Sequence, residues 1–418
     1  MLAATAGLIL AVTPSLMAQE GGALHAARQG QVTPVDELLV ELLGAGPGAA
    51  GTLIAQLQQE QSAVSMPALA ELLAEIQKLP EAVLQDRRDT PNGALTDRRW
   101  ARGTGIGFDV IRTMGGSEEL LLLRKLTQAP AEIDPTVLAL QTGPLEDTLR
   151  SVLLRQTDAY SATGSLYRDL ASWAAPTLLR AIAATRSLEG LHALPALLGK
   201  REEFDSYVLT QIASIARFAR APLNDGELNR IRRFLDSQKP EERRNAAQAL
   251  GFLDDTESIP ELIELLRDAD QSVVQSSYSA LRLITAMTID PGYRLWVNWH
   301  GRESHWWKTQ ATPHLNQVRS GRTGGMVVAL RELGSKRLFR REIAPYLEPL
   351  LTSERDETVR IALSALTSLR ANDTATLATM ESLLAHPNQV IREQASSSLR
   401  LITRREFLPK QPTLVRPR

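Results

Sequence analysis

The sequence predicts an all-α fold, an α-solenoid of stacked two-helix repeats that is interrupted by one tryptophan-rich insertion. Two observations predict this class. A four-point apolar pattern at i, i+3, i+4 and i+7 recurs along the chain, and each occurrence marks one buried face of a helix. Aromatic residues make up only 5% of the 418 residues, which is typical of thin helical layers that pack closely. A hairpin that is apolar on two sides is stable only where neighbouring hairpins cover it.

The stretch 240–287 shows the repeating unit most clearly. Its first helix carries a stripe of small and apolar residues, namely Ala246, Ala249, Leu250 and Leu253. A polar break follows, and we expect a second helix to begin near Pro260, because a proline in the first turn of a helix costs no hydrogen bond. The first pattern then returns at Ser277, Ala280, Leu281 and Ile284. The unit is therefore a helical hairpin.

The third position of the pattern can be followed through nine helices. Seven of the eight intervals between these positions span 31 to 38 residues, which is the length of a two-helix repeat. Several register-matched intervals in a row are much harder to obtain by chance than one match. The nine positions are Ile111, Leu149, Ile182, Ile215, Leu250, Leu281, Leu330, Leu366 and Leu399.

The first helix of the hairpin resembles that of the HEAT repeat and of the HEAT-like repeats of phycobilisome lyases. The likeness rests on a "VR…A…AL" pattern, which is echoed in TVRIALSAL (358–366) and VIREQASSSL (390–399). The resemblance implies a solenoid that holds protein partners along a concave face. It covers the repeat and includes no active site.

The predicted organisation is a signal peptide at 1–18, a divergent N-terminal helical region at 19–104, HEAT-like repeats at 105–286, a Trp/His-rich insertion at 287–325, further repeats at 326–404 and a basic C-terminal tail at 405–418. Residues 80–104 lack helical periodicity. They are expected to form either a long loop or the boundary before the regular repeats.

The first 18 residues are apolar and end in small residues, with Ala18 as a plausible cleavage point, and this is typical of a secretory signal peptide. We therefore expect an exported protein, periplasmic or extracellular. A retained membrane anchor is the alternative, but Gly7 and Pro14 interrupt a run that is shorter than the roughly 20 residues of a membrane span. Because the chain has no cysteine, it has neither disulfides nor a lipidated cysteine.

The longest interval, 49 residues, contains the insertion, with four of the six tryptophans and three of the six histidines. One interpretation is an exposed aromatic surface with a basic rim that grips a peptide or stacks on sugar rings. The other is that the tryptophans fold back and fill the space between the flanking repeats, because burial of a large apolar side chain is worth about 1.5–3 kcal/mol. The candidate binding residues are Tyr293, Trp296, Trp299, Arg302, Trp306, Trp307 and Lys308.

No catalytic or cofactor motif is recognisable. His300 and His305 are five residues apart, whereas zinc peptidase helices place their histidines four apart, so we expect no metal site, with a loop-built zinc site including His314 as the alternative. The formal net charge of −1 argues against nucleic acid. The basic residues at 319–341 either guide an acidic partner or line a solvated helix end.

These observations favour a non-catalytic, exported interaction scaffold without cofactors, whose protein partners bind the concave face and the insertion. The alternative is an envelope carbohydrate-binding protein that uses the tryptophans. A lyase or metal-dependent hydrolase ranks third.

Overall fold

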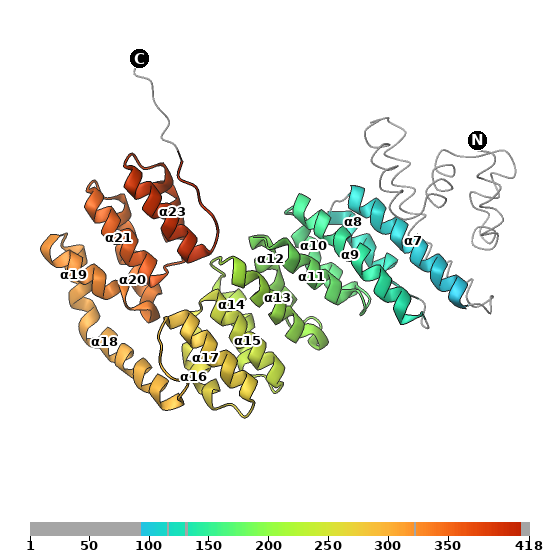
Figure 1. The fold of residues 1–418 in the computed structure, drawn as a ribbon, viewed down its shortest axis with the longest axis horizontal. Coiled ribbons are helices and arrows are strands. Elements are labelled where there is room, and N and C mark those ends of the chain that lie inside the picture. The colour runs from blue at the N-terminus through green and yellow to red at the C-terminus, as the bar shows by residue number, and fades with distance from the viewer. Residues whose placement is uncertain (1–92, 115–116, 130–132, 322, 411–418) are drawn as a thin grey trace, which may run out of the picture. The chain divides into compact units, whose positions relative to one another are not determined.

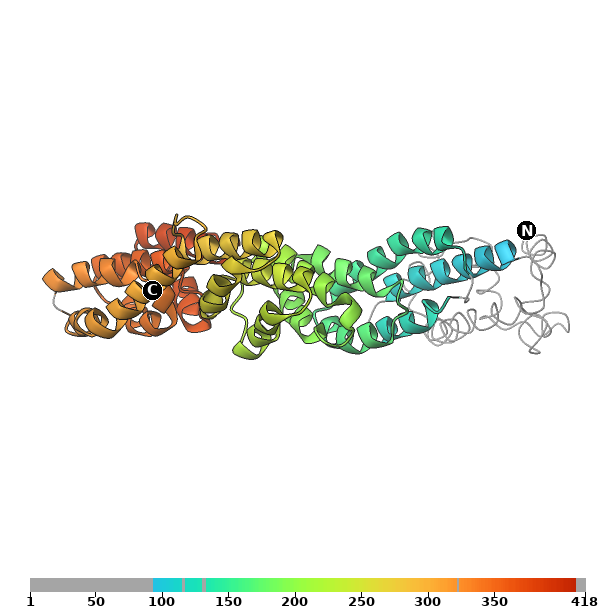
Figure 2. The same ribbon diagram turned by 90° about the horizontal axis from the view of Figure 1, so that it is seen from below.

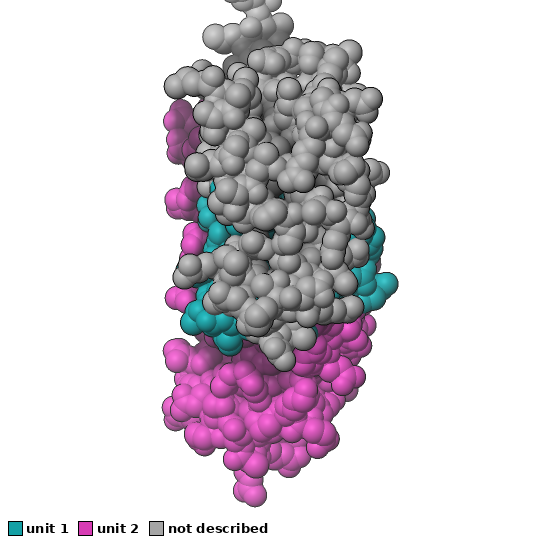
Figure 3. Space-filling model, turned by 90° about the vertical axis from the view of Figure 1, so that its right-hand side faces the viewer, with its two compact units in different colours: residues 1–185 teal, residues 186–418 magenta. Residues whose placement is uncertain are grey.

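The computed structural model describes residues 93–410, apart from 115–116, 130–132 and 322. In these residues all regular structure is helical, which confirms the predicted all-α class (Figures 1 and 2). The chain divides into two compact units, Met1–Thr185 and Arg186–Arg418, which are coloured separately in Figure 3. The expected signal peptide and most of the divergent N-terminal region lie outside the described residues.

Unit 1 consists of helical hairpins in its described part. Its helices are α7 (Gly93–Met114), α8 (Ser117–Leu126), α9 (Pro135–Arg155), α10 (Ala159–Asp169) and α11 (Ala175–Thr185). The first helices α7, α9 and α11 pack side by side, and α8 packs on α10. A long loop, one of the two alternatives for 80–104, is wrong for residues 93–104, which belong to α7. The buried Trp100, edge-on to Trp173 at 6.0 Å, anchors this segment.

Unit 2 begins with six helices, three first helices and three second helices, which we call the first stack. Its first helices α13 (Asp205–Phe218), α15 (Pro240–Leu253) and α17 (Gln271–Thr285) pack in sequence order. Its second helices are shorter and end in 3-10 turns: α12 (Leu188–Ala193) with η1 (Leu194–Leu197), α14 (Asp225–Arg232) with η3 (Arg233–Asp236), and α16 (Ile259–Glu264) with η5 (Leu265–Arg267). The expected second helix near Pro260 is thus confirmed as α16. Two further 3-10 turns, η2 (Glu202–Phe204) and η4 (Thr256–Ser258), lie in the connections.

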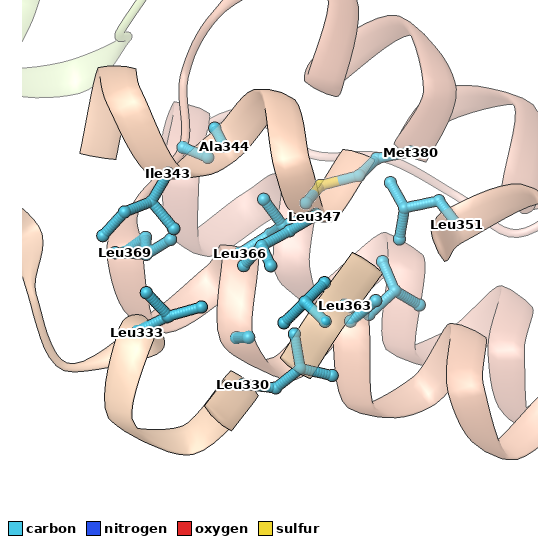
Figure 4. Packing of buried hydrophobic residues seen from close by; sticks show 14 of the residues in the cluster. Leu330, Leu333, Ile343, Ala344, Leu347, Leu351, Leu363, Leu366, Leu369 and Met380 are labelled. Atoms are coloured by element: carbon cyan, nitrogen blue, oxygen red, sulfur yellow. The ribbon is translucent and has the colours of Figure 1, made fainter. Parts of the chain in front are cut away.

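The remaining hairpins of unit 2 form the second stack, shown close up in Figure 4. Its first helices are α19 (Thr323–Gly334), α21 (Asp356–Leu369) and α23 (Gln389–Thr403), which pack in this order. Between them lie η6 (Arg337–Phe339), α20 (Arg340–Leu347), η7 (Glu348–Thr352), α22 (Thr374–Ser382) and η8 (Leu383–Ala385). After α23 the chain runs back along the last hairpin, where Lys410 N donates to Leu384 O at 2.9 Å and Phe407 packs on the apolar core.

The sequence pattern identifies the buried face of each first helix correctly. All nine third-position residues, from Ile111 in α7 to Leu399 in α23, have 0% of their surface exposed. Small residues on the same faces let neighbouring helices approach closely. At Gly251 of α15, an added Cβ would lie 2.8 Å from the Cα of Ala280 in α17. The alanine-rich stripes therefore set the spacing between layers.

Most of the insertion is a single long helix, α18 (Tyr293–Arg319), which connects the two stacks (Figure 1). It packs on α16 of the first stack and on α19 and α20 of the second. The interval of 49 residues therefore reflects a second helix of 27 residues, far longer than the other second helices of unit 2.

Candidate functional site

The N-terminal part of α18 is held by tryptophans that point inward. Trp296 is fully buried and lies edge-on to Tyr278 of α17 at 6.5 Å and to Trp299 at 5.5 Å. Its indole Nε1 donates to the carbonyl of Asp290 at 3.1 Å, so the polar end of the ring is satisfied as well. This cluster joins α18 to the first stack.

The C-terminal part of α18 is held in a similar way by the second stack. Trp306 is buried, and the Nζ of Lys336 lies 4.5 Å from the centre of its ring. Trp307 stacks on Phe339 of η6, with 4.6 Å between ring centres. A cation over an indole face contributes about 0.5–2 kcal/mol. Together these contacts fix the orientation of the helix.

The seven candidate binding residues differ in exposure: three are buried, two are half-buried and two are exposed. Trp296, Trp299 and Trp306 are buried, so their rings are not part of an exposed aromatic surface, and the geometry favours the packing interpretation for them. The Tyr293 hydroxyl donates to Glu264 Oε1 at 2.9 Å, and this hydrogen bond raises the pKa of Tyr293. Arg302 and Lys308 are exposed, Lys308 on the side of α18 opposite the buried tryptophans and Arg302 at the edge of their side, between Trp299 and Trp306.

The histidines of α18 do not converge on a common point. Burial lowers the pKa of His300, His305 is exposed, and His314 stacks on Trp306 at 6.0 Å between ring centres. Within the described residues, no group of three or more His, Cys, Asp or Glu side chains is arranged to hold a metal ion.

A second feature, which we call the arginine joint, links the two stacks of unit 2. It consists of Asp254, Arg220, Arg340, Arg370 and Arg404. Asp254 Oδ2 accepts from Arg340 Nη1 at 2.8 Å and from Arg220 Nη1 at 3.3 Å, and Arg370 Nη1 lies 3.8 Å from Asp254 Oδ1. The joint thus connects residues that are up to 184 positions apart in the sequence.

The joint lies where first helices of both stacks end. Arg404 Nη1 donates to Ala216 O and Arg217 O at the end of α13, at 3.1 and 2.8 Å. Arg220 Nε donates to Phe252 O of α15 at 3.1 Å, and Arg370 Nη1 donates to Leu283 O of α17 at 2.9 Å. The last carbonyls of a helix lack intrahelical partners, and together they are equivalent to about half a negative charge at the helix end. Arginines are therefore stabilised here although only one carboxylate faces them.

Three residues of the joint occupy positions where glycine is usual. Asp254, Arg370 and Arg404 follow the last residues of α15, α21 and α23 with φ of 64°, 55° and 60°. A left-handed residue closes the helix end, but a side chain there costs roughly 1–2 kcal/mol. Because each of these side chains bonds across the joint, the long-range contacts offset that local cost.

Burial also changes the acid–base properties of the joint. It lowers the pKa of Arg220 to about 10, against the opposing effect of the Asp254 carboxylate. Burial lowers the pKa of Arg404 and of the neighbouring Arg337 in the same way. With a pKa of about 10 Arg220 is a cation at neutral pH, and Asp254 is the carboxylate that compensates its burial.

The sequence interpretation of the basic residues at 319–341 did not foresee this arrangement. Arg340 is buried in the joint, and Arg341 bonds Asp225 at 2.9 Å and also bonds Glu257, both of the first stack. A cavity of about 460 Å³ beside these contacts is lined from both stacks. In the sequence, the only indication of the arginine joint is that residues other than glycine follow some of the predicted first helices. This feature cannot be interpreted without knowledge of the long-range contacts.

These features define the class of the molecule: it is an all-helical protein built from stacked two-helix repeats. Residues 194–282, in the first stack, match the family model of HEAT repeats, which confirms the HEAT resemblance for this segment. No curated protein matches the chain.

Among solved structures, the chain is similar to an engineered protein from the Northeast Structural Genomics Consortium, with 16% identity, a TM-score of 0.30, and coverage of 86% of this chain and 100% of the other. A second engineered protein from that consortium has 17% identity, a TM-score of 0.23 and coverage of 68% and 96%. Computationally designed armadillo repeat proteins for modular peptide recognition have 16% identity, a TM-score of 0.20 and coverage of 50% and 99%. With TM-scores this low, these structures do not bear on the function.

None of the described helices combines the length and apolar character that crossing a membrane requires. The expected export therefore stays a prediction from residues 1–18, which are outside the described part.

Proposed function

We propose that the protein is a non-catalytic scaffold that binds protein partners, and that α18 makes the specific contact. The observation that carries this proposal is the two-sided character of α18. Three buried tryptophans hold a helix of 27 residues in place, while the face that includes Arg302 and Lys308 lies in solvent. A rigid helix with a free face is suited to docking, because little conformational entropy is lost on binding.

The carbohydrate-binding alternative depends on aromatic rings that a sugar can reach. Trp307 and Tyr293 are the two candidate aromatics that are partly exposed, and each already has a partner within the fold, Phe339 and Glu264. Sugar stacking would need one of these contacts to be given up. A protein partner needs no such rearrangement.

A lyase or hydrolase remains the third proposal, and its support is weaker because helical solenoids mostly present surfaces rather than enclosed sites. Export to the periplasm or beyond is part of the same proposal, and the partner would then be an envelope or secreted protein. Contact along a concave face is likewise proposed from the HEAT-like repeats alone.

Site-specific photo-cross-linking in cells tests the proposal. A photoreactive amino acid at position 308 is expected to capture a discrete protein, whereas the same group at the exposed Glu354 of the second stack is expected not to. Quenching of tryptophan fluorescence by glycans, without any captured protein, would favour the carbohydrate alternative. Stoichiometric zinc that is lost in the double variant His300→Ala/His305→Ala would favour an enzyme.

A further inference from the structure

We propose that the solvent-facing side of α18 binds an acidic segment of a protein partner, lying along the helix and approaching it most closely at Gly301. This inference rests on the proposed scaffold function and names the chemistry of the partner. We call this side the outer face. It is formed by Arg294, Asn298, Gly301, Arg302, His305, Lys308 and Thr309, all of which are exposed.

The charges of α18 are sorted between its two sides. Arg294, Arg302 and Lys308 lie on the outer face, and Glu303 is the only acidic residue in the whole helix. Glu303 lies toward the second stack, where its Oε1 accepts from Lys336 Nζ at 3.4 Å. With a rise of about 1.5 Å per residue, the three cations span roughly 21 Å of the helix. The outer face is thus a basic row without a counter-charge of its own.

The three cations have no partner within the described part of the chain. None of them forms an ion pair, a side-chain hydrogen bond or a ring contact there. The contrast is the last basic residue of the helix, Arg319, whose guanidinium lies 4.6 Å from the centre of the Tyr346 ring. The outer cations therefore remain available for carboxylates, and they can steer an acidic partner to the helix.

Gly301 supplies an independent indication that another molecule approaches here. Glycine inside a helix is destabilising relative to alanine, because it loses more backbone entropy on folding. At Gly251 the fold itself explains the glycine, since a Cβ would collide with the next helix. At Gly301 an added Cβ would meet nothing within 4 Å. The backbone of a partner laid against the outer face would explain the glycine, because that backbone needs the space next to Arg302.

Apolar side chains flank the N-terminal end of the basic row. Leu295 is 49% exposed and Val297 is 41% exposed, on either side of Arg294. Interfaces commonly combine such apolar contacts with a charged rim. A partner with leucine or similar residues next to its acidic run matches this end of α18, which favours a polypeptide over an anionic polysaccharide.

Fluorescence anisotropy with the full chain tests the inference. The probe is a fluorescein-labelled 15-residue peptide of alternating glutamate and leucine, and the competitors are heparin and single-stranded DNA. Arg302→Glu/Lys308→Glu is expected to weaken peptide binding at least ~10-fold, and the affinity is expected to fall with added salt. The matched control is Arg355→Glu/Arg400→Glu, which changes the net charge equally at exposed sites of the second stack.

A second variant separates steric fit from charge. Gly301→Leu keeps the charge and is expected to weaken peptide binding at least ~10-fold while the stability of the fold is unchanged or raised. Equal loss in the control double variant, or tight binding of heparin or DNA in place of the peptide, would overturn the inference. It would also fail if Gly301→Leu bound normally. The scaffold proposal fails separately, if position 308 captures no protein in cells.

Discussion

Replacement of Asp254 by asparagine tests whether one buried carboxylate holds the two stacks of unit 2 together. The side chain of Asp254 is 1% exposed, and those of its partners Arg220 and Arg340 are 2% and 3% exposed. Asparagine has nearly the same shape, so the change removes the charge without creating a cavity. Both guanidinium groups would then be buried without a counter-charge.

The expected cost follows from that geometry. Removing one partner of a buried ion pair costs about 3–5 kcal/mol, because the remaining charge is left without compensation. The amide oxygen of asparagine can still accept one hydrogen bond, and Arg220 keeps its bond to Phe252 O. We therefore expect Asp254→Asn to lower the free energy of unfolding by about 3 kcal/mol, the lower end of this range.

Urea titration at pH 7, followed by tryptophan fluorescence, measures this change. Four of the six tryptophans lie on α18, so the signal reports mainly on unit 2. The control is Asp225→Asn, which breaks the bond to Arg341 across the same pair of stacks at a side chain that is 68% exposed. We expect the control to cost less than about 1 kcal/mol. If the two variants behave alike, burial of Asp254 is not what stabilises the joint.

Two further predictions concern other contacts in unit 2. Gly251→Ala is expected to destabilise the chain by about 1–3 kcal/mol, because the clash of a Cβ 2.8 Å from the neighbouring backbone outweighs the gain in helix propensity. Gly301→Ala is expected to stabilise the chain by about 1 kcal/mol, since its Cβ meets no neighbour. Urea titration of both variants checks these opposite signs. Asp268→Asn removes the ion pair with Arg243, whose two hydrogen bonds to Asp268 at 2.7 and 2.9 Å lower the pKa of that carboxyl. Because the pKa is lowered, the ion pair stabilises the fold above about pH 4, and this contribution is lost as the pH falls through the lowered pKa. The variant should be about 1.5 kcal/mol less stable than the parent at pH 7, with a difference that shrinks as the pH falls below about 4, and a difference that does not depend on pH would contradict this account.

The candidate site shows how far local patterns reach. Composition and spacing identified the tryptophan-rich segment as exceptional and left two interpretations open, a binding surface or a packing element. The structure favours packing for Trp296 and Trp306, which are buried, whereas Arg302 and Lys308 are exposed and their binding role stays a prediction. The regular hairpin period gives no indication that residues 293–319 form one helix, because this second helix is longer than the period allows.

The repeat itself was determined by the sequence alone, because helical periodicity is a local property. The positions of the stripe follow from 3.6 residues per turn, and every third-position residue from Ile111 to Leu399 is buried as the period requires. A hairpin with two apolar sides has no stable alternative to stacking, so the class of fold needed no knowledge of distant contacts.

Only the tertiary structure decided where the stack is interrupted and how its two parts meet again. Arg404 reaches the end of α13 across 188 positions, and Arg340 reaches Asp254 across 86. In the sequence each of these residues is an ordinary charged side chain near a helix end. Their burial depends on helix termini brought together by a bridging helix, and no local period encodes that distance.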